Sequence, residues 1–316
     1  MKARRQPLVS IITPTYQRDR FLEATILSVL GQSYPNVEYI VIDGGSGENV
    51  LTILRTYEEQ LRWISEPEAG QVDAINKGFQ MASGEILAFI NSDDLYTPQA
   101  VAEAVLFFQQ NPDALIVYGD ASAIDEKDRS YGIRQHVRPC TLQDLVTAAN
   151  FIVQPTAFWR ASLWQELGEF DTSFPHVFDY EWWMRASQRH TLHYVQSCWA
   201  RERHYAATKT SLGGVKRFME LDRLGRRYGG SGIARNYRPE GAATYIHAGL
   251  VSLLGGQWKL GWEHIRTGTK INNSLLKLFI YLMPMILLGP GSVPKLRLYS
   301  NRIRQGMKKQ FDGRAQ

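Results

Sequence analysis

Two adjacent carboxylates, Asp93 and Asp94, follow the apolar residues Phe89-Ile90. Neighbouring carboxylates repel each other, and a buried one needs a partner, so such a cluster is costly to assemble. A divalent cation with a phosphate-bearing ligand would neutralise it, because Mg²⁺-type ions take one or two carboxylates together with phosphate oxygens and water. Taken alone, the pair is explained better by an Asp93 that caps a helix beginning near Pro98, with Asp94 in solvent.

A further carboxylate, Asp43, ends another apolar segment and is followed by Gly44-Gly45. The glycines allow a sharp turn and let a flat ligand approach the backbone. Asp43 could accept hydrogen bonds from a nucleotide base or from sugar hydroxyls. An Asp-Gly turn without a ligand explains it equally well.

Polar residues recur on the segment that begins at Glu66-Pro67-Glu68 and continues into a predicted helix. Asp73, Asn76 and Lys77 are three and four residues apart, so they share one face of that helix. Such a face is usually solvated. Because it precedes the acidic segment in the sequence, a hydroxyl- or phosphate-binding role is the alternative.

The run from Phe178 to Arg185 carries the next chemically dense cluster. Asp179 near the start of a helix would be stabilised as an anion by the helix dipole, and a general base must be an ionised carboxylate near an acceptor hydroxyl. The residues alone favour a helix-capping Asp179 with Trp182 and Trp183 as core. His204 is a candidate phosphate or metal contact, and its cationic neighbours favour phosphate, although a lone surface histidine explains it slightly better.

These residues follow strands of a predicted α/β sheet. Strands alternating with amphipathic helices indicate a mostly parallel sheet covered on both faces, and ligands bind such sheets at the carboxyl ends of the strands. Three polar clusters, at Thr13–Tyr16, Asp43–Ser46 and Asn91–Asp94, should therefore converge. The predicted strands are Leu8–Pro14, Val37–Ile42, Trp63–Ile64 and Ile86–Ile90, and the helices are Phe21–Leu30, Asn49–Gln60 and Val72–Ala82.

The composition is that of an ordinary globular chain of 316 residues, with 44% hydrophobic and 21% charged residues, a net charge of +5 and a pI near 9.1. Two cysteines, Cys140 and Cys198, have no metal-binding spacing and fit a reducing compartment. The first seven residues lack the apolar stretch of a signal peptide. Basic residues gather between Arg201 and Arg227 and again from Lys295 to Arg314, which suits a nucleic acid, an anionic membrane or simply a solvated face.

The motifs, taken in order, resemble those of family 2 glycosyltransferases with the GT-A fold, a Rossmann-like arrangement. The resemblance rests on Val9–Tyr16, Ile40–Ser46, the linking segment Glu66–Gly84 and Asn91–Asp94, and it extends over roughly Leu8 to Thr210. Several motifs in the expected order are far more specific than any one of them. The chain departs from the pattern where the family often has a second acid beside Asp43 and an Asp in place of Asn91.

The resemblance implies an inverting transfer of a sugar from a nucleotide diphosphate donor, most often a UDP-sugar. It implies that Asp43 contacts the base and that Asp94, together with Asp93, holds Mg²⁺ or Mn²⁺, with Asp93 also near the ribose. Asp179 corresponds to the base that activates the acceptor, and Glu181 to the acid that often follows it. The donor and acceptor region would further include Thr13, Pro14, Thr15, Tyr16, Gly70, Asp73, Asn76, Lys77, Asn91, Ser92, Gln154, Trp182 and His204.

The carboxyl-terminal third changes to helical spacing, so we expect a catalytic domain over 1–210 and a helical extension over 211–316. The apolar run Leu278–Leu288 contains Pro284 and is short for a membrane span. Packing on the catalytic domain is the simpler expectation, and peripheral membrane contact through the apolar helix and basic tail is the alternative.

We therefore expect a metal-dependent, inverting glycosyltransferase that builds a polysaccharide or lipid-linked glycan, in the cytoplasm or on the inner face of its membrane. A nucleotidyltransferase acting on sugar phosphates would need a glycine- and basic-rich phosphate loop, which Thr13–Arg18 does not supply. A non-catalytic nucleotide-sugar-binding protein is the other alternative. A dinucleotide-dependent oxidoreductase is disfavoured because no G-x-G-x-x-G follows the first strand, and nucleic acid is not an expected partner.

Overall fold

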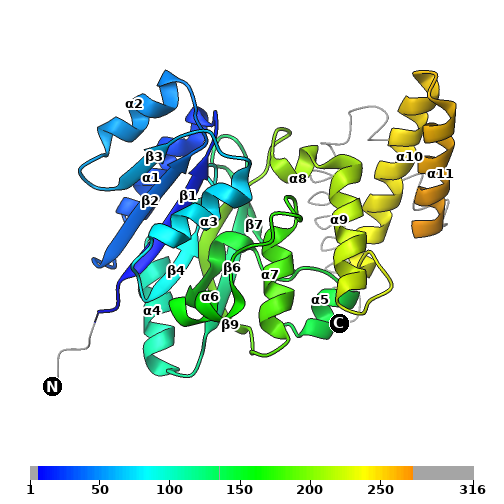
Figure 1. Cartoon of the computed structure of the whole chain (residues 1–316). Coiled ribbons are helices and arrows are strands. Elements are labelled where there is room, and N and C mark those ends of the chain that lie inside the picture. Colours follow the sequence, from blue (N-terminus) through cyan, green and yellow to red (C-terminus); the bar gives the residue numbers. More distant parts are fainter. Residues whose placement is uncertain (1–5, 135, 273–316) are drawn as a thin grey trace, which may run out of the picture. The chain divides into compact units, whose positions relative to one another are not determined.

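The computed structural model describes residues 6–134 and 136–272, which divide into two compact units (Figure 1). The first unit contains the residues up to Leu145 and Asn150–Arg203. The second contains Val146–Ala149 and the residues from His204 on. The run Leu278–Leu288 and the basic tail Lys295–Arg314, on which membrane contact was predicted, lie outside the described residues.

The first unit is built on one curled, mixed sheet with strand order β3-β2-β1-β4-β8-β6-β9-β5, and β7 pairs with β6. The β3-β2-β1-β4 half is parallel, as predicted, while β8 runs antiparallel to both β4 and β6. The strands are β1 (Val9–Thr15), β2 (Val37–Asp43), β3 (Arg62–Ser65), β4 (Ile86–Phe89), β5 (Leu95–Tyr96), β6 (Ile116–Ile124), β7 (Ser130–Ile133), β8 (Ala157–Arg160) and β9 (His193–Arg203).

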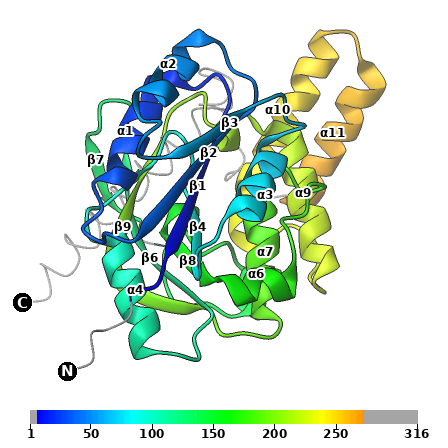
Figure 2. The same cartoon turned by 60° about the vertical axis from the view of Figure 1, so that its left-hand side comes forward.

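Helices cover both faces of this sheet, as the sequence predicted. Every residue of β1 and β4 is buried, which requires cover on both sides. Figure 2 shows α1 and α4 on one side of these strands and α3, α6 and α7 on the other. The helices of the unit are α1 (Asp19–Leu30), α2 (Glu48–Thr56), α3 (Gln71–Met81), α4 (Ala100–Gln110), α5 (Leu142–Thr147, whose last two residues belong to the second unit), α6 (Ala161–Leu167) and α7 (Phe178–Ser187).

The parallel half forms where the sequence places apolar runs between helical segments. The four predicted strands and three predicted helices are all present, with bounds shifted by a few residues. Two glycines allow close packing at this half: a methyl group at Gly78 on α3 would collide with the Ile12 side chain, and one at Gly84 would lie 2.6 Å from the backbone nitrogen of Ser10. Because β1 pairs in parallel with both β2 and β4, the carboxyl ends of these three strands lie at one edge of the sheet.

The second unit is helical in its described residues. Its helices are α8 (Lys209–Leu212), α9 (Gly214–Arg227), α10 (Arg238–Leu254) and α11 (Trp258–Ile271). α10 ends at Gly255 and Gly256, and α10 and α11 form an antiparallel pair. Across the described chain, no helix has both the length and the apolar character needed to cross a membrane.

Candidate functional site

The ends of β1 and β2 form one side of the candidate site. Thr15 and Asp43 are partners in the parallel register, and the backbone N–H of Gly44 donates to the Thr15 carbonyl at 2.9 Å. Tyr16 is 57% exposed, and its ring lies against Gly44, where an added methyl group would come within 3.3 Å of it. The Thr15 hydroxyl is buried with no hydrogen-bond partner among the described residues. An aromatic ring and an unused hydroxyl therefore flank Asp43.

Asp43 is fully buried and held by two serines. Its Oδ2 accepts hydrogen bonds from the Ser46 backbone N–H at 2.9 Å and from the Ser65 hydroxyl at 2.6 Å, and its Oδ1 accepts from the Ser46 hydroxyl at 2.5 Å. A carboxylate offers about four acceptor positions, so one remains for a ligand. The serines fix the carboxylate before any ligand arrives.

Asn91, at the end of β4, joins three segments of the chain. Its Oδ1 accepts from Gln71 Nε2 at 2.7 Å, and its Nδ2 donates to Gln154 Oε1 at 3.2 Å and to Asp94 Oδ2 at 3.3 Å. Gln154, in a short 3₁₀ turn (Gln154–Thr156), also donates to the Phe89 carbonyl at 2.6 Å. The Asn91 amide thus connects α3, β4 and the segment before β8.

Asp94 is buried at the closing position of a turn in which its backbone N–H donates to the Asn91 carbonyl at 3.1 Å. Burial raises the pKa of Asp94 well above its usual range, and the nearby carboxylates Asp93 and Glu202 raise it further. Hydrogen bonds from the Arg203 backbone and the Asn91 amide oppose this rise. A buried carboxylate beside two others is an environment that an added cation would stabilise.

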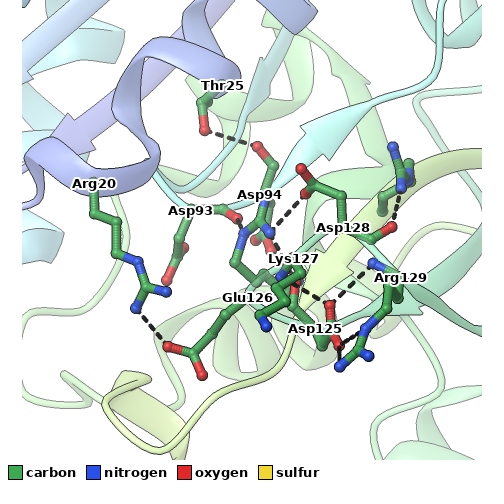
Figure 3. A network of polar contacts seen from close by, with 11 residues as sticks. Arg20, Thr25, Asp93, Asp94, Asp125, Glu126, Lys127, Asp128 and Arg129 are labelled. Atoms are coloured by element: carbon green, nitrogen blue, oxygen red, sulfur yellow. Dashed lines mark hydrogen bonds and ion pairs between the residues drawn. The ribbon is translucent and has the colours of Figure 1, made fainter.

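Arg203, the last residue of β9, holds the Asp93–Asp94 turn. Its backbone N–H donates to Asp94 Oδ1 and its Nε donates to the Asp93 carbonyl, both at 2.8 Å. The Arg203 side chain is 1% exposed. Its guanidinium donates to the Asp125 carbonyl at 2.8 Å, pairs with Asp128 at 2.7 Å and lies over the Phe21 ring. Figure 3 shows Asp93 and Asp94 beside the turn that contains Asp125 and Asp128.

The Asp93–Asp94 turn, called the acidic turn below, is also held in place by residues of α1. Thr25 donates its hydroxyl hydrogen to the Asp94 carbonyl at 2.8 Å, and Arg20 pairs with Glu126 on the facing turn at 2.5 Å (Figure 3). Ser92 is buried and Asp93 is half-buried between these supports. The candidate metal-binding turn is therefore held from α1, β9 and the β6–β7 connection.

Two of the polar residues predicted on α3 have structural partners. Asn76 is buried and exchanges two hydrogen bonds of 3.0 Å with the backbone of Phe170, so both of its polar atoms have a partner within the protein, and its ligand role stays a prediction. Lys77 pairs with Glu66 and Glu68 and fixes the loop before the helix. Gly70 is exposed and Asp73 half-buried at the first turn of α3, next to Gln71.

The two carboxylates predicted as catalytic on α7 differ in their surroundings. Asp179 lies half-buried in the first turn of α7. The neighbouring Phe178 packs its ring 5.8 Å from that of Phe89, which brings this end of α7 to the end of β4. Glu181 is fully buried and pairs with Arg185 at 2.8 Å. Glu181 therefore belongs to an ion pair within the helix, and its catalytic role stays a prediction.

Trp182 is fully buried, and its predicted contact with the ligand stays a prediction. Its ring packs 5.1 Å from Trp159 and 5.6 Å from Phe170, and its indole N–H donates to the Gly168 carbonyl at 3.1 Å. Trp182 and Trp183 are both buried, as expected from the residues alone. This aromatic cluster packs against the buried face of α7.

His204 is the first residue of the second compact unit and directly follows Arg203 in the chain. The basic residues from Arg201 to Arg227 are not all surface charges: besides Arg203, Arg217 is buried and pairs with Glu240 at 3.1 Å. Sequence reasoning did not assign the supporting roles of Gln71 and Arg203. Gln71 directly follows the predicted Gly70, but Arg203 carried no local signal beyond its charge.

The acidic turn suits a cation that shares its coordination with a ligand. Within the described residues, no group of three or more His, Cys, Asp or Glu side chains could hold a metal on its own. Asp94 with Asp93 supplies the one or two carboxylates that Mg²⁺-type ions use when phosphate oxygens complete the coordination. The residues present therefore fit a metal bound together with a phosphorylated ligand, and not a closed protein cage.

Comparisons with known proteins agree on one family. The family model described as Glycosyl transferase family 2 matches residues 10–170. An uncharacterized glycosyltransferase of Rickettsia prowazekii is 27% identical over 224 residues, which cover 68% of this chain and 70% of the relative. One from Mycobacterium tuberculosis is 34% identical over 189 residues, covering 57% of this chain and 69% of the relative.

Solved structures share the fold at low identity. TarS 1-349 of S. aureus, solved in complex with UDP-GlcNAc, is 14% identical with a TM-score of 0.58, over 83% of this chain and 90% of that one. The mannosyltransferase PcManGT from Pyrobaculum calidifontis, solved with GDP-Man and Mn²⁺, is 19% identical with a TM-score of 0.56, over 89% of this chain and 88% of that one. The curled sheet with its flanking helices is thus a GT-A arrangement.

Proposed function

The chain belongs to glycosyl transferase family 2, and from this premise we propose that it transfers a sugar from a nucleotide diphosphate donor to a hydroxyl acceptor with inversion at the anomeric carbon. The observation that carries the proposal is the junction at the ends of β1, β2 and β4. There a pre-fixed Asp43, a buried Asp94 and the Gln71–Asn91–Gln154 amide network converge.

The nucleotide base is proposed to bind at Asp43. The one acceptor position left on this carboxylate suits a ring N–H such as that of uracil, and the exposed Tyr16 offers a face for the base. The buried Thr15 hydroxyl is available to the same ligand. TarS and PcManGT, solved with UDP-GlcNAc and GDP-Man, support a nucleotide-sugar donor, and we favour a UDP-sugar.

The diphosphate is proposed to bind with Mg²⁺ or Mn²⁺ at Asp94 and Asp93. The Mn²⁺ in the PcManGT structure supports this choice of cofactor. The metal, when bound, stabilises charge on the departing diphosphate. Arg203, Thr25 and Asn91 hold the turn in place, so the carboxylates need no rearrangement when the donor arrives.

Asp179 is proposed as the general base. The acceptor oxygen forms its bond to the anomeric carbon as the bond from that carbon to the diphosphate breaks, and the electron pair leaves with the diphosphate. Asp179 takes the acceptor proton, and the amino end of α7 stabilises it in the ionised form that this requires. Gly70, Asp73 and Ser92 are proposed to contact the sugar and diphosphate. An acceptor in polysaccharide or lipid-linked glycan synthesis remains part of the proposal.

A donor screen tests the proposal. We expect one UDP- or GDP-sugar to raise the melting temperature of the protein and to be hydrolysed slowly when Mg²⁺ or Mn²⁺ is present, with both effects lost in chelator. The matched control is the same nucleotide without its sugar. Stabilisation by a donor that is neither hydrolysed nor transferred with either metal would instead identify a nucleotide-sugar-binding protein.

A further inference from the structure

The tip of the α10–α11 pair, which we define as residues 250–262, exposes an unusual number of large apolar side chains. Six of the thirteen large apolar side chains exposed in the described residues lie between Leu250 and Trp262. Leu254 is 90% exposed, Trp258 65% and Trp262 61%. Every residue from Leu254 to Leu260 is exposed, whereas α10 is buried over Gly241–Ile246 at its other end. An apolar concentration of this kind marks a binding surface.

The two helices contact each other through glycine. A methyl group on Gly249 would lie 2.7 Å from the carbonyl oxygen of Gly261, and one on Gly261 would lie 2.9 Å from that of Gly249. A methyl group on Gly268 would likewise lie 2.7 Å from the carbonyl oxygen of Ala242. The backbones therefore meet directly, and the large apolar side chains at the tip face outward. In water, large side chains usually fill such a contact; small residues at it are typical of helices packed in lipid.

The exposed side chains surround the tip and do not form one flat face. Trp258 and Trp262 lie on the same side of α11, while Leu260 is about 200° around the axis from Trp258 at roughly 100° per residue. The exposed Leu250 and Leu254 extend the surface onto α10. A protein groove would cover one side, whereas a lipid interface surrounds an inserted tip.

Charge along α11 fits an anionic lipid surface. No charged residue occurs between Gly249 and Trp258 at the tip, and Lys259, Arg266 and Lys270 are all exposed, against one acid, Glu263. At 1.5 Å per residue, Arg266 is about 12 Å along the axis from Trp258, which matches headgroup depth for a helix inserted about 5–10 Å. Residues 273–316 continue this bias in sequence, with eight Lys or Arg and one Asp.

We propose that the α10–α11 tip inserts into the interface of an anionic lipid bilayer. Trp258, Trp262 and Leu254 enter the acyl boundary, Lys259 extends its long side chain from the tip back to the headgroups, and Arg266 and Lys270 contact the headgroups farther along α11. The proposal is independent of the proposed reaction, because its test needs neither donor nor turnover.

The test measures flotation of the full chain with vesicles of phosphatidylglycerol and phosphatidylcholine, and with vesicles of phosphatidylcholine alone. We expect binding to the anionic vesicles, reduced about tenfold or more by Leu254→Ser/Trp258→Ser/Trp262→Ser. Arg266→Gln/Lys270→Gln should weaken it about fivefold per charge. Brominated acyl chains should quench the tryptophan fluorescence of the parent and not that of the triple variant.

The matched control is Leu27→Ser/Leu106→Ser/Leu212→Ser, which removes three exposed apolar side chains on α1, α4 and α8. Its vesicle binding should equal that of the parent. Melting temperature confirms that each variant is folded. Absence of parent binding, or equal binding by parent and tip variant, overturns the proposal. A tip variant that changes the oligomeric state in light scattering without changing vesicle binding also overturns it, since the patch would then bind a second copy.

Discussion

The backbone N–H of Arg203 donates to Asp94 Oδ1 at 2.8 Å, while the Arg203 side chain donates to the Asp93 carbonyl at the same distance. One residue at the end of β9 therefore orients both candidate metal ligands. Since its guanidinium also bonds to the Asp125 carbonyl, the β6–β7 turn is tied to the acidic turn through it. Arg203 acts as a positioning residue, because it holds Asp94 through its carboxylate and Asp93 through its backbone carbonyl.

Replacing Arg203 with Met should weaken metal use. The carbonyls of Asp93 and Asp125 lose their donor, so the acidic turn loosens, and loss of such outer support typically costs about 10- to 100-fold in metal affinity or activity. We expect the Mg²⁺ or Mn²⁺ concentration for half-maximal turnover to rise by that factor, with partial rescue by Arg203→Lys.

The control for this prediction is Arg217→Met, which removes another buried guanidinium, paired with Glu240 in the second unit. Both substitutions should lower the melting temperature, but only Arg203→Met should change the metal dependence. An unchanged metal dependence in Arg203→Met would assign Arg203 a purely structural role.

The parallel half of the fold was predictable because its signals are local. Apolar runs that end in Thr13–Tyr16, Asp43 and Asn91 mark both the strands and their carboxyl ends, and parallel topology brings those ends together. The second half of the sheet depends on pairing between distant segments: β8 lies antiparallel between β4 and β6, and nothing near Ala157 in the sequence specifies this.

The same distinction between local and long-range interactions explains which roles of the site residues could be predicted from the sequence. Arg203 resembled a surface charge because its burial arises from contacts with residues about 78 and 110 positions away. The site roles of Glu181 and Trp182 were implied by the family resemblance at the segment that contains Asp179. On a helix, however, successive residues point in different directions, and these two turn into the core.

The fixed carboxylate of Asp43 leads to a prediction about donor affinity. Asp43→Asn places an amide where the Ser46 N–H and two hydroxyls donate, and it weakens the remaining acceptor for a base N–H. Hydrogen bonds to charged groups contribute about 1.5–3 kcal/mol, so the donor Kd should rise about 10- to 100-fold. Isothermal titration with the donor or its nucleoside diphosphate measures this.

Ser65→Ala is the graded control, because it removes one of three hydrogen bonds and leaves the charge. It should raise the Kd by less than Asp43→Asn does. If Asp43→Asn binds the nucleotide as tightly as the parent protein, the base does not bind at Asp43.

Glu38 leads to a prediction about stability at low pH, away from the site. Burial raises the pKa of Glu38, but hydrogen bonds from Ser10 and from the backbone and hydroxyl of Ser83, together with Arg62, outweigh it and lower the pKa overall. The ionised form is therefore favoured in the folded state. Its stabilisation is complete above the unfolded pKa of about 4.3 and is lost as pH falls through the lower folded value.

Glu38→Gln should accordingly reduce the free energy of unfolding at pH 7 by about 1 kcal/mol, a modest value because solvent screens the Arg62 charge, and the difference from the parent should shrink below about pH 4. Urea unfolding across this pH range measures it. Because Glu38 lies at the start of β2, opposite the end that carries Asp43, kcat should not change. A difference that grows as the pH falls would contradict this assignment.

Substitutions of the two carboxylates of α7 should affect catalysis and stability separately. Asp179→Asn keeps the shape of the side chain and removes the proposed proton acceptor, so turnover should fall by about 10²–10⁴ while donor affinity is unchanged. Glu181→Gln instead removes the buried charge that pairs with the partly exposed Arg185, and losing a hydrogen bond to a charged group costs about 1.5–3 kcal/mol. Its turnover per folded molecule should stay near that of the parent.

Single-turnover kinetics on each variant, with the folded fraction taken from thermal melts, measure both quantities. The two substitutions are chemically matched, since each replaces an acid with its amide on one helix two residues apart. If Glu181→Gln lost turnover in full while Asp179→Asn kept it, the roles would be reversed, and the buried ion pair would have to open during the reaction. If both variants kept full turnover, the proton acceptor would lie outside α7.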